Sequence, residues 1–144
     1  MVATVSILNR YQELLSEVDS WFLHCSLAAG TQISCQRGCS ACCRGLFDIT
    51  LLDARLVRQG FESLPAETKQ QVVLRAQQSI AGIRTFWPDF DQPYLFNDYP
   101  EEEWDLVMPE EDETPCPLLG QDGLCLIYGY RPMTCRLNGI PMVD

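Results

Sequence analysis

The sequence predicts a small, mainly α-helical single domain that spans residues 1–144. Three observations support this fold class: an apolar stripe at helical spacing near the N-terminus, a capping-box pattern before a second apolar run, and a proline that opens a third. The chain has 144 residues, of which 47% are hydrophobic, and this is enough for one core. We therefore expect about three helices, a cysteine-rich loop, and a C-terminal hairpin followed by a short helix.

The first expected helix runs from about residue 5 to residue 27. Its apolar side chains recur at alternating spacings of three and four residues, which places them on one face of a helix. They are Leu8, Tyr11, Leu15, Val18, Phe22 and Cys25. Cys25 is best interpreted as a packed residue of this face, and the neighbouring His24 as a surface residue. Residues 1–34 should thus form an N-terminal helix that precedes a core of residues 35–144.

Two further helices are expected before residue 86. Thr50 and Asp53 have the spacing of a capping box, which should start a short helix that ends near Gly60. Pro65 suits the first turn of the next helix, because proline lacks only an N–H that has no helical partner there. The buried face of that helix should consist of Val72, Ala76, Ile80 and Ile83.

The segment from Phe86 to Pro115 shows neither helical nor strand periodicity. It is rich in acidic and aromatic residues and contains no Lys or Arg. Its acidic part, residues 98–113, admits two interpretations: a solvated loop, or a docking surface for a basic protein partner. Its aromatic residues either cover the core or line a ligand pocket.

The C-terminal part should form a hairpin and a short helix. Residues 120–123 read GQDG, a turn signal, so residues 124–128 are expected to form a short strand. Pro132 suits the first turn of a brief helix that carries Cys135. Folded back on the cysteine-rich loop, these two elements would close a metal site.

The charge of the chain excludes several classes of partner. A formal net charge of −10 argues against a nucleic-acid or anionic-membrane surface, which would need a basic patch. No stretch reaches the roughly 18 apolar residues of a membrane span. The N-terminus lacks the early basic residue and apolar run of a signal peptide. A cytoplasmic location is expected, where thiols stay reduced, so the eight cysteines should be metal ligands or redox groups rather than disulfides.

The densest chemical signal is CQRGCSACCR, residues 35–44. Cys39 and Cys42 have the CxxC spacing that lets two thiolates bind one metal ion from a single turn, and Cys35 offers a third. Adjacent side chains point apart in extended backbone, so Cys42 and Cys43 rarely reach the same metal. One of the two should therefore serve a second metal, bridge two metals, or pack as a small apolar residue.

A second group of cysteines lies far along the chain, at Cys116, Cys125 and Cys135. We expect the fold to bring it to the first group, with a primary ligand set of Cys39, Cys42 or Cys43, Cys125 and Cys135. Cys35 and Cys116 would complete or extend this site. Seven thiolates exceed one tetrahedron, so a binuclear centre is an open alternative.

The ligand chemistry favours a soft metal. The chain has one histidine, and sulfur ligands select zinc, iron–sulfur clusters or copper(I) over magnesium or calcium. Zinc is the preferred cofactor, with iron or an iron–sulfur cluster as the alternative. Arg37, Arg44 and Arg136 each lie within two residues of a cluster cysteine and could offset the negative charge of a thiolate site.

These cysteines belong to a longer pattern. After Cys35-x3-Cys39-x2-Cys42-Cys43 come Cys116-Pro117-Leu118-Leu119, residues 123–128 as GLCLIY, Arg131-Pro132 and Cys135-Arg136. Over roughly residues 35–139 the chain resembles the YkgJ-type cysteine-cluster family of zinc- or iron-chelating domains. The resemblance implies metal binding by the seven cysteines of the pattern. Many members continue beyond the position where this chain ends and carry a further cysteine there, so the resemblance leaves a complete and a C-terminally truncated core as open alternatives.

Two functional classes follow. The first is a protein that binds zinc or iron in a structural or metal-handling role and is not an enzyme by itself, since no Ser/His/Asp set, phosphate loop or HExxH motif occurs. The second is an iron–sulfur protein that acts in an enzyme such as a protein-lysine methyl transferase, as more distant relatives of the family imply. The three-cysteine spacing of radical S-adenosylmethionine enzymes also matches. That reading is disfavoured because no barrel of alternating strands and helices is predicted.

Overall fold

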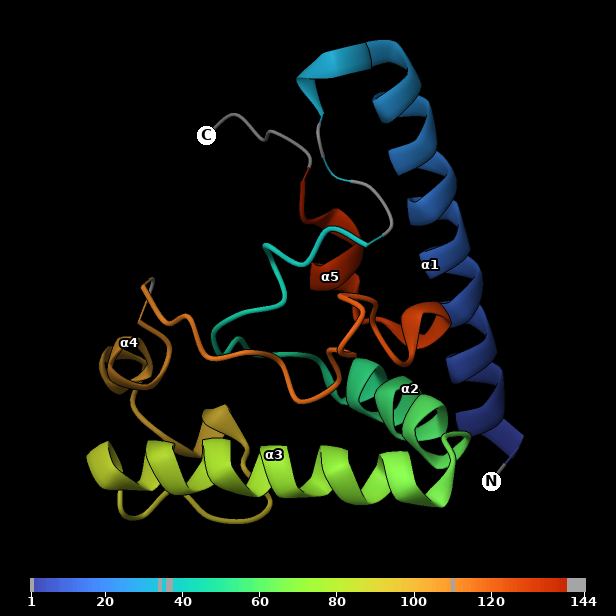
Figure 1. Cartoon of the computed structure of the whole chain (residues 1–144). Helices are drawn as coiled ribbons and strands as arrows, with labels where there is room; N and C mark the ends of the chain where they lie inside the picture. Colours follow the sequence, from blue (N-terminus) through green and yellow to red (C-terminus); the bar gives the residue numbers. More distant parts are fainter. Residues whose placement is uncertain (1, 34, 36–37, 110, 140–144) are drawn as a thin grey trace.

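The computed structural model describes residues 2–33, 35, 38–109 and 111–139. Within these residues the protein is mainly helical, as predicted, with five α-helices, four short 3₁₀ helices and no β-strand (Figure 1). The helices surround an irregular centre that contains the cysteine-rich loop and the segment from residue 111 to residue 139. None of the helices in these ranges is both long enough and apolar enough to cross a bilayer.

Helix α1, Val2–Ala29, forms one edge of the molecule and continues into the 3₁₀ turn η1, Gly30–Gln32 (Figure 1). It confirms the predicted N-terminal helix. Its inner face packs on the short helix α5, and Leu15 on that face is almost fully buried. The hydroxyl of Tyr11, one turn earlier, donates a hydrogen bond of 2.8 Å to Asp53 in α2.

Helix α2, Leu51–Glu62, starts with the predicted capping box. The Thr50 hydroxyl oxygen accepts from the backbone N–H of Asp53 at 3.1 Å, and the Asp53 carboxylate accepts from the N–H of Thr50 at 3.3 Å. The helix ends at Glu62, two residues after Gly60 and so near the expected position. Gly60 is buried inside the helix, and a Cβ there would lie 2.9 Å from side-chain atoms of Ile127 and Tyr130. It is therefore a point of close packing and not a helix terminator.

Helix α3, Ala66–Phe86, crosses the molecule below α2 and confirms the third predicted helix (Figure 1). Pro65 occupies its N-cap position. On the predicted face Val72 is buried, whereas Ala76, Ile80 and Ile83 are half-buried. The guanidinium of Arg75 donates to the carbonyl oxygen of Leu119 at 2.7 Å, which ties α3 to the C-terminal segment.

The segment after α3 has only short helices, in agreement with its lack of periodicity. They are η2, Phe96–Asp98; η3, Glu101–Glu103; and α4, Trp104–Val107. An aromatic cluster holds this segment together: Phe90 is 4% exposed and stacks on Trp87, and Phe96 contacts Trp104 edge to face. The acidic residues of the segment are mostly exposed, so the docking interpretation of residues 98–113 stays a prediction.

The predicted turn forms at residues 120–123, but the predicted strand over 124–128 does not. The N–H of Gly120 donates to Leu124 at 2.8 Å, and a single bridge joins Leu119 to Cys125. The ladder does not extend further because the N–H of Cys116 bonds to Cys43 instead, and the N–H of Tyr130 turns back to Ile127. The chain instead enters the 3₁₀ helix η4, Tyr128–Tyr130, and then α5, Met133–Leu137, which confirms the short helix after Pro132.

Candidate metal centre

The two groups of cysteines meet through their backbones. The N–H of Cys116 donates to the carbonyl oxygen of Cys43 at 2.9 Å, and the N–H of Gly45 donates to Thr114 at 2.9 Å. An isolated antiparallel bridge between Arg44 and Pro115 lies between these bonds. The end of the CQRGCSACCR loop therefore runs alongside the start of the second cysteine group.

The first group sits on a tight turn. The N–H of Cys43 donates to the carbonyl oxygen of Ser40 at 3.0 Å, which curls residues 40–43. Gly38, just before it, has a φ of +93°, a value that favours glycine, and a Cβ there would lie 3.6 Å from Leu124. The loop thus rests on the turn that precedes Cys125. Arg37 lies outside the described residues.

All eight cysteines are free thiols. Of the predicted ligands Cys39 is exposed and the others are half-buried. Cys25, on α1, is also half-buried, in agreement with its interpretation as a packing residue. Free thiols of this kind are the donors that zinc and iron–sulfur clusters use once deprotonated.

Two thiols at the centre of the site have strongly raised pKa values. Burial, followed by negative charge on Cys116, Cys42, Cys125 and Cys43, raises the pKa of Cys135 to about 12. Burial likewise raises the pKa of Cys43 to about 11, with contributions from Cys42, Cys116 and Cys125. Each of these thiols is therefore within electrostatic range of cysteines from both groups, as a shared site requires.

Cys35 approaches the site from the other side. Burial raises the pKa of its thiol first, followed by the charges of Cys42 and Cys39. The residue also lies against the end of the chain segment after α5, since a Cβ on Gly139 would lie 2.8 Å from the sulfur of Cys35. Negative charge on Cys42 thus raises the pKa of both Cys35 and Cys135.

Arg131, which the sequence reasoning did not select, is a cation whose charge acts on two of the thiols. Its charge opposes the pKa increase of both Cys35 and Cys125, so it would stabilise their thiolates. The guanidinium stacks 3.6 Å above the ring of Tyr128 and donates to the carbonyl oxygen of Tyr128 at 3.0 Å. The sequence criterion was adjacency to a cysteine along the chain, and Arg131 becomes a neighbour only through the fold.

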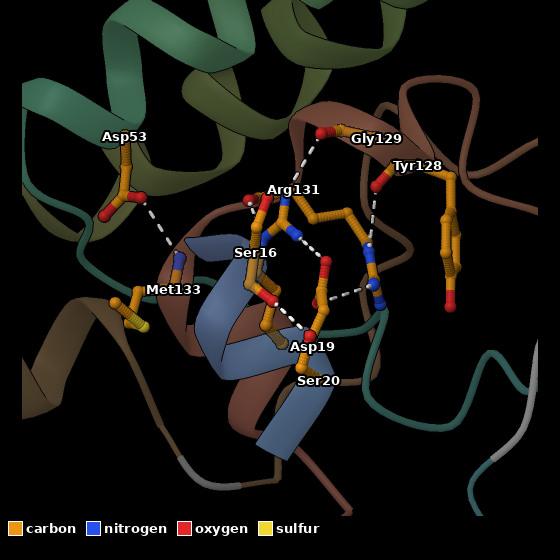
Figure 2. Close-up of polar contacts among 9 residues, drawn as sticks. Ser16, Asp19, Ser20, Asp53, Tyr128, Gly129, Arg131 and Met133 are labelled. Carbon is orange, nitrogen blue, oxygen red and sulfur yellow. Dashed lines mark hydrogen bonds and ion pairs between the residues drawn. The ribbon is translucent and has the colours of Figure 1, made fainter. Parts of the chain in front are cut away.

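Arg136, which the sequence assigned to the thiolates, is used elsewhere. The residue is 7% exposed, and its guanidinium forms an ion pair and hydrogen bond with Asp19 of α1. It also donates to the carbonyl oxygens of Gly129 and Arg131, both at 2.9 Å. Figure 2 shows Asp19 projecting from α1 toward Arg131 and Gly129. Arg136 therefore fixes the segment that carries Cys135 to α1.

Arg44, the other predicted counter-charge, lies at the surface. It pairs with the carboxylate of Glu113 at 3.5 Å and donates to the carbonyl oxygen of Glu113 at 3.2 Å. These contacts reinforce the junction between the two cysteine groups.

The thiols are brought to one region but are not closed into a ready cage. Among the described residues, no three His, Cys, Asp or Glu side chains are arranged so that they could hold a metal ion as they stand. The donor set itself fits zinc or iron, because it consists of free sulfur donors from two chain segments joined at Cys43 and Cys116. Final closure would accompany metal binding, as in other small thiolate domains.

An open cavity of about 1280 Å³ adjoins this region on the side of Cys116. It lies between the segment 45–51, helix α3 and the residues that follow α3. Its walls are largely apolar, with Leu46, Phe47, Ile80, Phe90, Phe96 and Val107 among them. The aromatic residues after α3 thus do both things considered from the sequence: they pack on one another and they line a cavity.

Residues 34–140 match a family model described as "CxxCxxCC: Putative zinc- or iron-chelating domain". The match includes all seven predicted ligands and leaves all of α1 outside. No curated protein matches the chain, and neither does any solved structure.

Proposed function

The chain belongs to the CxxCxxCC family of zinc- or iron-chelating domains, and from this premise we propose that it binds zinc through cysteine thiolates in a structural or metal-handling role. The observation that carries the proposal is the backbone hydrogen bond of 2.9 Å between Cys116 and Cys43. Because of this bond, ligands that are distant in sequence need only side-chain and loop adjustments to share one ion.

The proposed tetrahedron consists of Cys116, Cys125, Cys135 and either Cys42 or Cys43. Support for it comes from Cys135, on which the other four thiols all exert an electrostatic effect. The sequence favoured Cys39 over Cys116. Cys39 is exposed, however, and of the thiols with raised pKa values its charge affects only Cys35. A tetrathiolate zinc site carries a net charge of −2, which Arg131 would partly offset.

A binuclear variant uses the remaining thiols. Cys35 and Cys39 would bind a second ion together with Cys42, the thiol that acts on both Cys35 and Cys135. Cys43 would then complete the first tetrahedron with Cys116, Cys125 and Cys135, and Cys42 would serve only the second ion. This arrangement gives the adjacent pair Cys42 and Cys43 separate roles, as their opposite side-chain directions require.

The cavity beside Cys116 favours a second candidate function. A metal centre that opens onto an apolar cavity can act on a bound molecule, which suits an iron–sulfur protein with an enzymatic role better than a closed structural zinc site. In that case the thiolates would hold a cluster, and the cavity would take the substrate.

One experiment separates the two candidates. The chain is purified without oxygen and analysed for zinc, iron and acid-labile sulfide, and its visible spectrum is recorded. The zinc proposal predicts a colourless protein with about one zinc ion per chain, or about two in the binuclear variant, and no sulfide. A brown protein with iron and sulfide in similar amounts would overturn it in favour of the second candidate.

A further inference from the structure

Helix α1 has a second apolar stripe that the fold does not cover. Ile7, Leu14 and Trp21 follow one another at intervals of seven residues and are 53%, 45% and 50% exposed. Residues seven apart lie nearly above one another on an α-helix, with a drift of about 20° per interval. One exposed leucine needs no explanation, but three large exposed apolar side chains in heptad register recur on one face of the helix.

The position of α1 leaves this stripe open to a partner. The helix forms an edge of the molecule, and its inner face is used by α5 and by the contacts of Tyr11 and Asp19 (Figure 1). All of α1 also precedes the residues that match the metal-binding family. The exposed stripe is therefore not part of the packing that builds the metal centre.

The charges beside the stripe indicate which partner fits. Arg10 and Glu17 are both exposed, lie on the same flank of the stripe, and have opposite sign. In the part of the chain that the structure describes, neither forms an ion pair. Their midpoint along the helix almost coincides with Leu14, which is itself midway between Ile7 and Trp21.

We propose that the chain forms a homodimer in which two copies of α1 pack antiparallel about a two-fold axis at Leu14. Leu14 then meets Leu14 of the second copy, and Ile7 meets Trp21 of the second copy. An antiparallel pair brings equivalent flanks together, so Arg10 lies within about one residue's rise, about 1.5 Å along the axis, of Glu17 of the second copy. Two interchain ion pairs result, one on each side of the axis.

This arrangement is specific for a second copy of the chain. In a parallel pair the flank with Arg10 and Glu17 would face the opposite flank of the partner helix, and these two side chains would not meet. The ion pairs are also needed, because each copy carries a formal charge of −10 and the copies repel one another. The proposal is independent of which metal the protein binds.

The first test compares two leucines on opposite sides of α1. Analytical ultracentrifugation of the full metal-loaded chain should show a concentration-dependent dimer. Leu14→Glu places two like charges at the two-fold axis and should raise the dimer dissociation constant at least about tenfold. Leu23, which is 58% exposed, lies nine residues further, about 180° around the helix, so Leu23→Glu should leave the dimer intact.

The second test exchanges the charges. Arg10→Glu and Glu17→Arg should each weaken the dimer about tenfold, and the double variant should restore it, because the pair is re-formed with its sign reversed. Both residues are exposed, so the fold should survive, and far-ultraviolet circular dichroism checks this. Three outcomes would each overturn the proposal. They are a chain without substitutions that stays monomeric, equal effects of Leu14→Glu and Leu23→Glu on the dimer, and a double variant that does not restore the dimer.

Discussion

Cys43 and Cys116 are joined by a backbone hydrogen bond of 2.9 Å, although more than half of the described chain lies between them. The bond uses main-chain atoms only and leaves both side chains free for a metal. It also makes the site dependent on the tertiary fold, since neither cysteine group contains enough well-placed donors alone. Metal binding and folding should therefore be tightly coupled.

Metal removal should destabilise the protein. Structural zinc contributes on the order of 10 kcal/mol of folding free energy in small thiolate domains, so a chelator should lower the melting temperature markedly. Thermal unfolding followed by circular dichroism, with metal content verified before and after, measures this. As the control, the chelator-treated chain is reloaded with zinc and its melting temperature is measured in the same way. A melting curve that does not change after verified removal would contradict a structural role.

Removal of one central thiol should abolish tight zinc binding. Cys135→Ser removes the thiol whose pKa is raised by cysteines of both groups. It should lower zinc affinity by more than about 100-fold, because about 100-fold is the upper limit for substitutions that only disturb the orientation of a ligand. Competition with a chromophoric chelator gives the affinity. Cys25→Ser is the matched control, because Cys25 is free and half-buried but lies on α1 outside the family match. Equal zinc affinities of the two variants would refute the proposed ligand set.

Zinc affinity should rise with pH. In the metal-free protein the pKa of Cys43 is about 11 and that of Cys135 about 12, so both thiols hold their protons at neutral pH and must release them to the metal. Calorimetric titrations of the metal-free protein with zinc, at several pH values and in buffers of different ionisation enthalpy, measure the number of protons released on binding. A zinc affinity that is independent of pH between about 6 and 8 would contradict thiol ligands with raised pKa values.

The metal-free protein should lose stability at alkaline pH. A thiol whose pKa is raised in the folded state stabilises that state fully below its unfolded value, near 9.0, and this contribution is lost as pH rises toward the folded value of about 12. Urea unfolding of the metal-free chain should therefore give a falling free energy of unfolding above about pH 9. The slope should be smaller in Cys135→Ser and unchanged in Cys25→Ser.

The helical part of this fold could be predicted because its signals are local. The capping box at Thr50 and the stripe around Leu15 act within a few residues, and both are confirmed. The error arose where distant segments decide. The expected strand after the 120–123 turn does not form because the N–H of Cys116 on the opposite segment bonds to Cys43 instead.

The meeting of the two cysteine groups was predictable, and the charges around them were not. The cysteine spacings indicated a thiolate site, and the need for enough ligands indicated that the two groups meet. No pattern along the chain revealed that Arg136 would pair with Asp19 while Arg131 approached the thiols. Such charge assignments depend on side-chain directions that only the tertiary structure defines.

The buried carboxylate of Asp53 should be a main determinant of stability. It is 2% exposed and accepts hydrogen bonds from the Tyr11 hydroxyl at 2.8 Å and the Met133 N–H at 3.1 Å, so it connects α1, α2 and α5. Asp53→Ala leaves these donors unpaired and should cost about 3 kcal/mol, whereas Tyr11→Phe removes one bond and should cost about 1 kcal/mol. Urea denaturation of the zinc-loaded protein measures both, with the exposed Asp98→Ala as a control near zero.

Two helical glycines should respond to alanine with opposite signs. Alanine favours a helix interior over glycine by up to about 1 kcal/mol, and Gly82 in α3 has no neighbour within 4 Å of an added Cβ, so Gly82→Ala should stabilise the protein. At Gly60 the same Cβ would lie 2.9 Å from Ile127 and Tyr130, and the resulting overpacking costs about 1–3 kcal/mol. Gly60→Ala should thus destabilise the protein and loosen the contact between α2 and η4. Because the two variants share the same change in helix propensity, the difference between their unfolding free energies isolates the packing cost. A stabilising Gly60→Ala would show that α2 does not approach η4 this closely.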